Sequence, residues 1–147
     1  MSLTKSYDPD NIFAKIISGE FSSVKIFEDD HVLAFMDVFP QSEGHMLVIS
    51  KTATAVNLLD MQEDALQKVI LASQKAARAA VAALSPDGVR VVQFNGSAAG
   101  QSVFHLHFHV IPMWEGRALS PHGGNPVEAD ELEKTAQKIR EQLSFLR

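Results

Sequence analysis

Three histidines alternate with apolar residues in the last third of the chain, in the segment His105-Leu-His107-Phe-His109. Side chains on a β-strand point alternately to its two faces. A strand through this segment therefore places all three imidazoles on one face, about 6.6 Å apart between neighbours at ~3.3 Å per residue. The apolar residues between them then face a core. We predict a strand over residues 103–111 that presents three imidazoles on a rigid apolar support.

The rest of the pattern predicts an α+β fold. A chain of 147 residues suits one domain, and we expect a single domain over residues 1–147. Helical spacing of apolar residues predicts a short N-terminal helix near residues 12–17 and two main helices, at 62–84 and at about 126–144. Runs of β-type residues predict strands at 24–27, 32–36, 45–50, 89–94 and 103–111. Because most of these strands follow one another through short loops, we expect a five-stranded antiparallel sheet.

Residues with capping chemistry predict where the helices begin and end. Short polar side chains favour the N-cap, and glycine favours the position after the last turn. The expected pairs are Asn11 (or Asp10) with Gly19 for the first helix, Asp60 with Glu63 in a capping box for the second, and Asn125 followed by Pro126 for the last.

Composition excludes several classes of protein. The chain has 13 Lys and Arg against 18 Asp and Glu, a formal charge of −5, so we expect no nucleic-acid partner. It has no cysteine, which excludes disulfides, thiolate catalysis and Cys-type zinc sites. No apolar run approaches the ~20 residues that a membrane-spanning helix needs, and the N-terminus has no export signal. We expect a cytoplasmic protein that does not contact a membrane.

The histidine segment fits three kinds of chemistry. Alternate histidines on a strand can share a zinc or iron ion, although no Asp or Glu lies near them in the sequence. Exposed histidines can also be solvated groups without a role. Alternatively, a neutral imidazole attacks phosphorus and leaves again, so it can form a covalent intermediate. The preceding loop favours this last alternative, because its small residues and the donors Asn95, Gln101 and Ser102 suit an anion. We expect no bound metal and no cofactor.

Several segments together resemble the histidine triad (HIT) family. The family signature, His-x-His-x-His and two apolar residues, stands here as His105-Leu-His107-Phe-His109-Val-Ile111, after the lead-in Gly100-Gln101-Ser102-Val103-Phe104. Residues 12–20, 35–41 and 44–51 also match the family pattern. The resemblance covers about residues 10–115, and the chain is most similar to the bacterial histidine-triad nucleotide-binding hydrolases.

The resemblance implies nucleotide binding and nucleotidyl transfer to water. The central histidine of the family attacks the α-phosphorus, which here is His107, and the last one, His109, helps to hold the non-bridging oxygens. His105 and His45 belong to the network that sets the orientation and tautomer of the nucleophile. The other implied contacts are Asn95, Gln101 and Ser102 for the phosphate and leaving group, Asp37 for the ribose hydroxyls, and Ile12, Phe13, Ile16, Phe35 and Val38 for the base.

The expected activity is hydrolysis of nucleoside 5′-phosphoramidates or related nucleotidyl esters, with a purine nucleotide such as AMP in the site and no cofactor. Two alternatives stay open: a dinucleoside polyphosphate hydrolase, and a nucleotide-binding adaptor with vestigial catalysis. Many bacterial relatives bind a structural zinc through Cys-x-x-Cys in the first helix. Asn11 and Ala14 stand at those positions, so we expect no zinc site there.

The resemblance also implies a homodimer that joins through residues about 62–94 and merges two five-stranded sheets into a ten-stranded one. The predicted helix at 62–84 is rich in alanine, and small side chains allow another element to approach closely. The strand at 89–94 would otherwise leave an open sheet edge, which proteins usually cover or pair. Both features support the expected homodimer.

Overall fold

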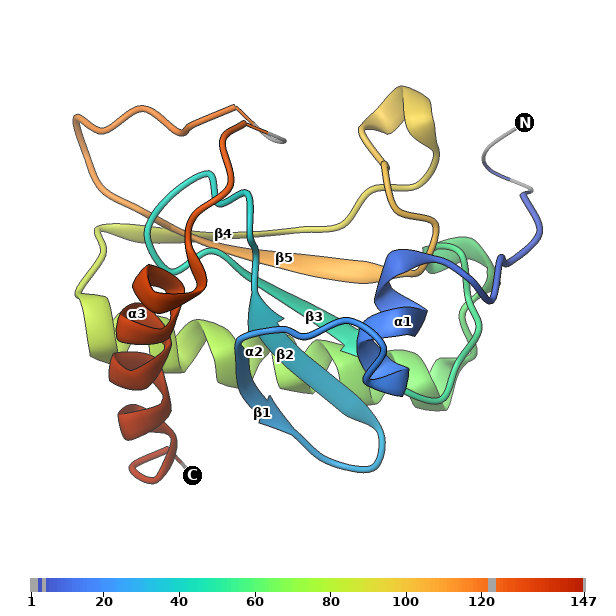
Figure 1. The fold of residues 1–147 in the computed structure, drawn as a ribbon, viewed down its shortest axis with the longest axis horizontal. Coiled ribbons are helices and arrows are strands. Elements are labelled where there is room, and N and C mark those ends of the chain that lie inside the picture. The colour runs from blue at the N-terminus through green and yellow to red at the C-terminus, as the bar shows by residue number, and fades with distance from the viewer. Residues whose placement is uncertain (1–2, 4, 122–123, 147) are drawn as a thin grey trace.

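In the computed structural model, five antiparallel strands form one sheet that is flanked by helices (Figure 1). The structure describes residues 3, 5–121 and 124–146. The strands are β1 (Lys25–Glu28), β2 (Val32–Met36), β3 (Met46–Ser50), β4 (Gly88–Val92) and β5 (His107–Met113), in the spatial order β1-β2-β3-β5-β4. The helices are α1 (Ile12–Ser18), α2 (Glu63–Leu84) and α3 (Ala129–Leu143), with short 3₁₀ turns at Leu58–Asp60 and Ser97–Ala99. The predicted α+β class, five-stranded antiparallel sheet and three helices are confirmed.

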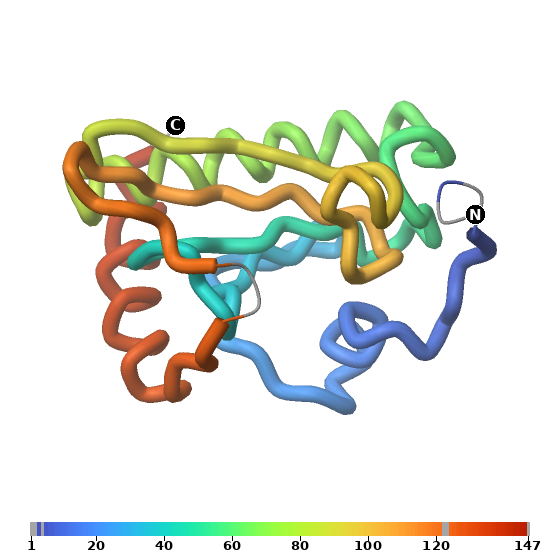
Figure 2. Tube along the Cα trace, turned by 90° about the horizontal axis from the view of Figure 1, so that it is seen from above, coloured from blue at the N-terminus to red at the C-terminus, as the bar shows by residue number. Residues whose placement is uncertain are grey.

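The two faces of the sheet pack against different helices and differ in the size of their apolar clusters. Figure 2 shows α2 along one side of the sheet and α1 on the other. Ala34, Val48 and Phe108 point toward α2, where they join a large apolar cluster that also includes residues of α3. Phe35 and Leu47 point the other way and pack with α1 in a smaller cluster. The smaller cluster leaves room for a site on the α1 side.

Helix α1 begins and ends where the sequence predicts. Asn11 is its N-cap, and its side-chain oxygen accepts hydrogen bonds from the backbone N–H groups of Phe13 and Ala14, both at 2.9 Å. Gly19 follows the last turn with a φ of 85°. Glycine adopts this left-handed conformation without the steric cost of a Cβ atom, so it ends the helix.

The predicted strand over residues 103–111 is wrong at both ends. The β5 strand begins only at His107, because the backbone N–H of Leu106 donates to the carbonyl of Ala55 at 2.9 Å instead of entering the sheet ladder. The strand also continues through Pro112 to Met113. Proline is tolerated there because β3 pairs with β5 only as far as Val110, so no ladder bond to β3 is lost.

The predicted N-caps of α2 and α3 are also wrong, although α2 itself (Glu63–Leu84) closely matches the predicted 62–84. Asp60 does not cap α2; it belongs to the preceding 3₁₀ turn, where it and Asn57 form a capping box. Asn125 does not cap α3, which begins at Ala129. The backbone N–H of Val127 donates to the carbonyl of Val38 at 2.9 Å, so this segment stays extended. Two strands differ less from the prediction. Strand β1 lies one residue later than the predicted 24–27, and β4 begins one residue before and ends two residues before the predicted 89–94.

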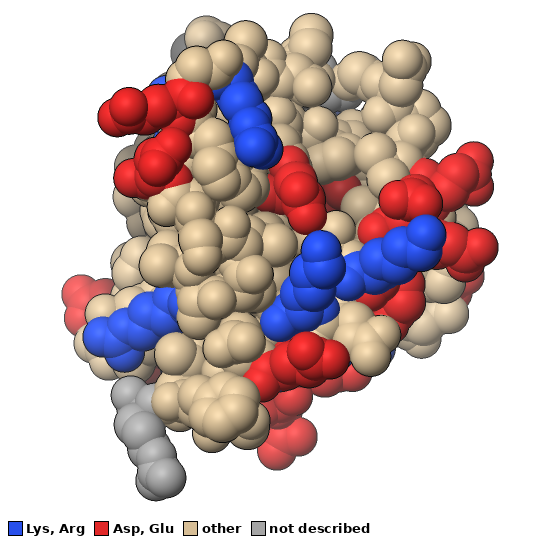
Figure 3. Space-filling model, turned by 90° about the vertical axis from the view of Figure 1, so that its left-hand side faces the viewer, with Lys and Arg blue, Asp and Glu red and all other residues tan. Residues whose placement is uncertain are grey.

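The described residues contain no helix that is both long and apolar enough to cross a membrane. On the face viewed in Figure 3, lysine and arginine side chains are interspersed with aspartate and glutamate. That face therefore presents no continuous basic surface of the kind that binds a phosphate backbone.

Candidate active site

A cavity of about 570 Å³ lies between α1, the end of β2 and the start of β5. It includes most of the predicted site residues, and its apolar part comes mainly from α1 and β2. The predicted residues that line it are Ile12, Phe13, Ile16, Phe35, Asp37, Val38, Ser102, His107 and His109; the others are Ser22, Ser23, Met36, Phe39, Leu47 and Val103. The fold thus brings one wall of apolar side chains against a wall that carries histidines.

The apolar wall has a buried floor and an exposed rim. Phe13 and Phe35 are buried and meet edge to face, with ring centroids 5.6 Å apart. Phe13 also meets the ring of His107 edge to face at 4.9 Å. Ile12 is 48% exposed and Val38 is 43% exposed. Exposed apolar side chains beside a cavity offer a surface that a flat apolar ligand can cover.

Backbone hydrogen bonding fixes the tautomer of His107. Its Nδ1 lies 2.7 Å from the carbonyl oxygen of His105, and a carbonyl can only accept. The proton of the neutral ring therefore sits on Nδ1, and Nε2 has the lone pair. The ring of His107 is buried beside that of His109, with centroids 4.9 Å apart.

The same reasoning assigns the protons of His45 and His109. The backbone N–H of Gln41 donates to His45 Nδ1 at 3.0 Å, so the neutral ring holds its proton on Nε2. That Nε2 lies 2.9 Å from His109 Nδ1 and donates to it. His109 then keeps its own proton on Nε2. The result is a buried chain in which His109 offers an N–H beside the lone pair of His107.

His105 is buried just before β5 rather than on the strand. Its Nε2 donates to the carbonyl of Ser50 at 3.1 Å, which leaves Nδ1 as an acceptor. Burial lowers the pKa of His105 to about 4, so the ring is neutral near pH 7. The Nδ1 atom accepts a hydrogen bond from the hydroxyl of Tyr7 at 2.7 Å.

Asp37 is a buried carboxylate at the edge of the cavity. Its Oδ1 accepts from the backbone N–H of Phe39 at 2.8 Å, which stabilises the turn after β2. Its Oδ2 lies 3.4 Å from His45 Nε2. Because Asp37 also lines the cavity, it links the turn, the histidine chain and the space a ligand would fill.

The predicted phosphate contacts separate into two groups. Ser102 lines the cavity. Gln101 is buried and does not, because its Oε1 accepts from Gly96 N–H while its Nε2 donates to the carbonyls of Val56 and Val103. Asn95 accepts from the backbone N–H of Leu58 at 2.8 Å. These two amides therefore hold the loop in shape.

Tyr7 makes a contact with the histidine site that the sequence does not reveal. It lies 98 positions before His105, and nothing in its polar N-terminal segment predicts a role in the site. A sequence pattern reports spacing within one element, so a contact between two distant loops leaves no periodic signal.

One group of described residues has the types and distances of a metal site. Asp37, His45 and His109 each offer a ligand atom within 4.8 Å of the others. The two histidines already meet at 2.9 Å through a proton, and Gln41 N–H occupies the other nitrogen of His45. This arrangement is that of a hydrogen-bonded chain, in which Asp37 faces the proton between the rings.

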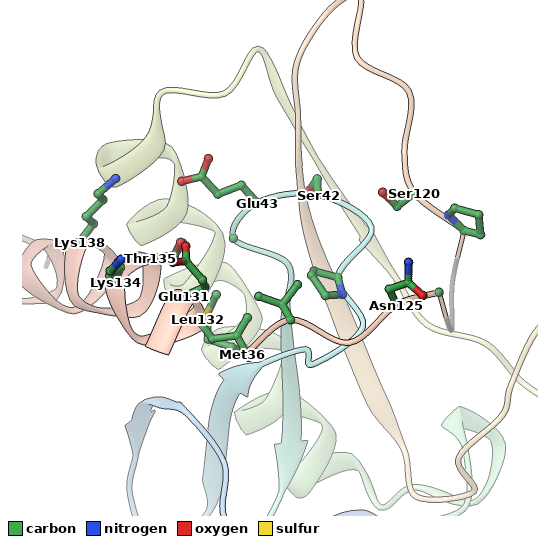
Figure 4. Close-up of a pocket in the computed structure, with 15 residues that line it drawn as sticks. Met36, Ser42, Glu43, Ser120, Asn125, Glu131, Leu132, Lys134, Thr135 and Lys138 are labelled. Atoms are coloured by element: carbon green, nitrogen blue, oxygen red, sulfur yellow. Dashed lines mark hydrogen bonds and ion pairs between the residues drawn. The ribbon is translucent and has the colours of Figure 1, made fainter. Parts of the chain in front are cut away.

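A second hollow, of about 760 Å³, lies between α3, the loop after β2 and the segment around Ser120 (Figure 4). Glu131, Lys134 and Lys138 reach it from α3, and Glu43 reaches it from the loop. Lys134 and Glu131 pair at 3.2 Å. None of the predicted site residues lines this hollow, and its charges of both signs favour no particular ligand.

Comparison with known proteins agrees with this geometry. The family model described as HIT domain matches residues 18–116. Protein hit of Bacillus subtilis is 43% identical, over 90% of this chain and 94% of its own. A Hit-like protein involved in cell-cycle regulation from Bartonella henselae, solved with an unknown ligand, is 48% identical and covers 93% of this chain and 98% of its own, with a TM-score of 0.89.

A hypothetical histidine triad nucleotide-binding protein from Sulfolobus tokodaii is 33% identical, covers 91% of this chain and 92% of its own, and has a TM-score of 0.83. The match to the family model spans the sheet, α2 and the three histidines. The resemblance in sequence and the likeness in fold therefore agree: this chain belongs to the histidine triad family.

Proposed function

We propose that the protein binds a purine nucleotide and hydrolyses nucleoside 5′-phosphoramidates or related nucleotidyl esters through a nucleotidyl-histidine on His107. The observation that supports this most is the tautomer of that ring. Its Nδ1–H is held by the carbonyl of His105 at 2.7 Å, so Nε2 has the lone pair that a nucleophile needs. The ring lines a cavity whose other wall is apolar.

The first step forms a bond between His107 Nε2 and the α-phosphorus and breaks the bond from phosphorus to the leaving nitrogen or oxygen. The electron pair of that bond stays with the leaving group: an amine or alcohol departs after it takes a proton from solvent, and the acyl group of an aminoacyl-adenylate departs as a carboxylate without one. The attached imidazole holds a positive charge while its Nδ1–H still donates to the His105 carbonyl. Water then attacks phosphorus and loses a proton to solvent, the electron pair of the N–P bond returns to Nε2, and neutral His107 and the nucleotide are released.

His109 would stabilise the charge that develops on phosphorus. Its Nε2–H, set by the donation from His45 to Nδ1, lies on the ring beside His107. A preorganised donor in a buried site stabilises a transition state more than the same donor in water, because no solvent must reorient. Asp37 near His45 would favour this proton arrangement by attraction to the His45 N–H.

The apolar wall would hold the base and Asp37 the sugar. Phe13, Phe35 and Ile16 form a floor, while Ile12 and Val38 would cover a bound ring from the rim. The relative from S. tokodaii is described as nucleotide-binding, which supports the same use of this cavity. Asp37 is the carboxylate that lines the cavity, and a carboxylate can accept from two adjacent hydroxyls.

We also propose a homodimer through α2 and β4. Strand β4 is at the edge of the sheet, and Val91 on it is 43% exposed. Ile70 and Val81 on α2 are 45% and 48% exposed. An open edge beside exposed apolar side chains supports pairing with a second copy. Light scattering at micromolar concentration tests this, since a mass near 16.1 kDa would be that of a monomer.

The test of the function is turnover of an adenosine 5′-phosphoramidate or an aminoacyl-adenylate, with AMP as product, before and after exhaustive chelation. We expect turnover to survive chelation, and a short reaction quenched with denaturant to contain protein with AMP attached. Loss of activity that added zinc restores would favour metal chemistry instead. AMP binding without turnover would favour an adaptor, and preferential cleavage of dinucleoside polyphosphates would favour the other hydrolase.

A further inference from the structure

The N-terminal segment before α1 lies against the histidine site. The hydroxyl of Tyr7 is 2.7 Å from His105 Nδ1, and the two rings are tilted by 56° with centroids 5.6 Å apart. Two residues earlier, the Lys5 ammonium lies 4.4 Å above the ring of Phe104. The segment is thus fixed at two neighbouring points just before β5.

The direction of the Tyr7 hydrogen bond follows from the other side of the same ring. His105 Nε2 must donate to the carbonyl of Ser50 at 3.1 Å, so Nδ1 of the neutral ring is an acceptor. The Tyr7 hydroxyl therefore donates. His105 is only 2% exposed, and a buried acceptor without a donor destabilises the folded protein. The ring is therefore held from both sides, by an acceptor at Nε2 (the Ser50 carbonyl) and a donor at Nδ1 (the Tyr7 hydroxyl).

What holds His105 also holds the nucleophile. His107 Nδ1 donates to the backbone carbonyl of His105 at 2.7 Å, and this bond defines the tautomer of His107. The peptide of His105 lies outside the sheet ladder, since β5 begins at His107. Its carbonyl is therefore positioned by the two tethers on the His105 ring and by the bond from Leu106 N–H to Ala55.

We propose that Tyr7 is a positioning residue of the active site, whose hydroxyl holds His105 so that the His105 carbonyl keeps the His107 ring in its reactive orientation and tautomer. The kinetic consequence rests on the proposed function. Tyr7 does not line the cavity, so it acts through His105 and not on the substrate. Its removal should therefore slow the chemical step and leave substrate binding intact.

Tyr7→Phe tests this, because it removes the hydroxyl and keeps the ring that packs on His105. A nucleophile held less accurately should lower kcat about tenfold, with KM unchanged within about twofold. Lys5→Ala is the matched control: it weakens the same segment at Phe104 and leaves the hydroxyl in place, so its kcat should stay near wild type. Tyr7 is the chain's only tyrosine, so growth on 3-fluorotyrosine alters this position alone and should preserve kcat.

A second measurement does not depend on turnover. The His107 Nδ1–H proton should give a resolved, slowly exchanging signal in the proton NMR spectrum, assigned by its loss in His107→Asn. We expect that signal to broaden or vanish in Tyr7→Phe and to persist in Lys5→Ala. If the wild-type protein fails to hydrolyse any nucleotidyl substrate, the proposed function fails, and this signal still decides the role of Tyr7.

Three outcomes would overturn the proposal. The first is a wild-type kcat together with an unchanged His107 signal in Tyr7→Phe. The second is a rise in KM alone, which would place Tyr7 in substrate binding. The third is an equal loss of kcat in Tyr7→Phe and Lys5→Ala, which would assign the effect to seating of the whole segment and not to the hydroxyl.

Discussion

The two faces of one sheet have different roles in this protein. The face toward α2 is filled: Val48, Met46 and Val110 are fully buried against a helix whose inward residues are mostly small. The face toward α1 bears Phe35 and Leu47, and beside them His107 and His109 at the cavity. In register, Leu47 pairs with His109 across β3 and β5, so an apolar residue and a histidine are direct neighbours. The short α1 leaves this second face partly open, and the histidines lie in that opening.

Loss of the His107 ring should have the largest effect on the α1 face. In the proposed mechanism, His107→Asn removes the lone pair that attacks phosphorus, so kcat should fall by at least ~10²–10⁴-fold. AMP affinity should be nearly unchanged, since the proposed base and ribose contacts come from α1 and the end of β2. Steady-state kinetics and calorimetric titration measure the two quantities. A variant with near-normal kcat would rule out the covalent mechanism.

The buried histidine of the α1 face should make stability depend on pH. Burial lowers the pKa of His105 from 6.5 to about 4, so the unfolded chain takes up this proton at a higher pH than the folded one. The contribution of His105 to stability should be fully present above pH 6.5, decline as the pH falls toward 4, and change no further below that. Between pH 7 and pH 5 this group should lower the free energy of unfolding by roughly 2 kcal/mol.

Urea unfolding at the two pH values measures this decline. His105→Asn cannot titrate, so its decline between pH 7 and pH 5 should be smaller than that of the wild type. The control is His31→Asn, which removes an exposed histidine and leaves the buried His105 in place. An equal decline in wild type and His105→Asn would show that His105 is not the neutral buried ring described above.

A pair of apolar substitutions compares the two faces directly. Val48→Ala on the α2 face deletes fully buried methyl groups and should lower the free energy of unfolding by about 1.5–3 kcal/mol, with AMP binding intact. Ile12→Ala at the cavity rim should change stability by less than ~0.5 kcal/mol, because that side chain is 48% exposed, and weaken AMP binding several-fold. Urea unfolding and calorimetry measure both. If Ile12→Ala lowered stability and Val48→Ala weakened AMP binding, the α1 face would be the structural one and the α2 face would bind the nucleotide.

The sequence predicts what is periodic or local. The alternation around His107 correctly placed it and His109 on one face, and the caps Asn11 and Gly19 correctly bounded α1. The same alternation extended the strand too far, because it cannot detect that Leu106 N–H finds Ala55, a residue 51 positions away. Spacing alone also assigned Asp60 to the wrong helix.

Side-chain partners at long range are the other feature that a local pattern does not predict. The amide of Gln101 could donate to a phosphate. In the structure it forms hydrogen bonds with three backbone groups, two in its own loop and one in a neighbouring loop. Tyr7 stands in a polar segment without a motif and meets His105 across the fold. Both facts depend on which loops lie together, and that is set by the packing of the sheet and helices and not by local pattern.

The smallest effect that we expect on the α1 face comes from Asp37, which lies between the turn after β2 and the cavity. One of its oxygens already accepts from Phe39 N–H, the other lies 3.4 Å from His45 Nε2, and the residue lines the cavity. A ribose 2′-hydroxyl that donates to this carboxylate should make AMP bind about tenfold more tightly than 2′-deoxy-AMP, a difference of ~1.4 kcal/mol. Asp37→Asn keeps an acceptor oxygen for the turn and removes the charge, so most of that discrimination should disappear while the fold persists. Calorimetric titration of both nucleotides into both proteins measures it, and an equal preference in wild type and variant would restrict Asp37 to holding the turn and the histidine chain.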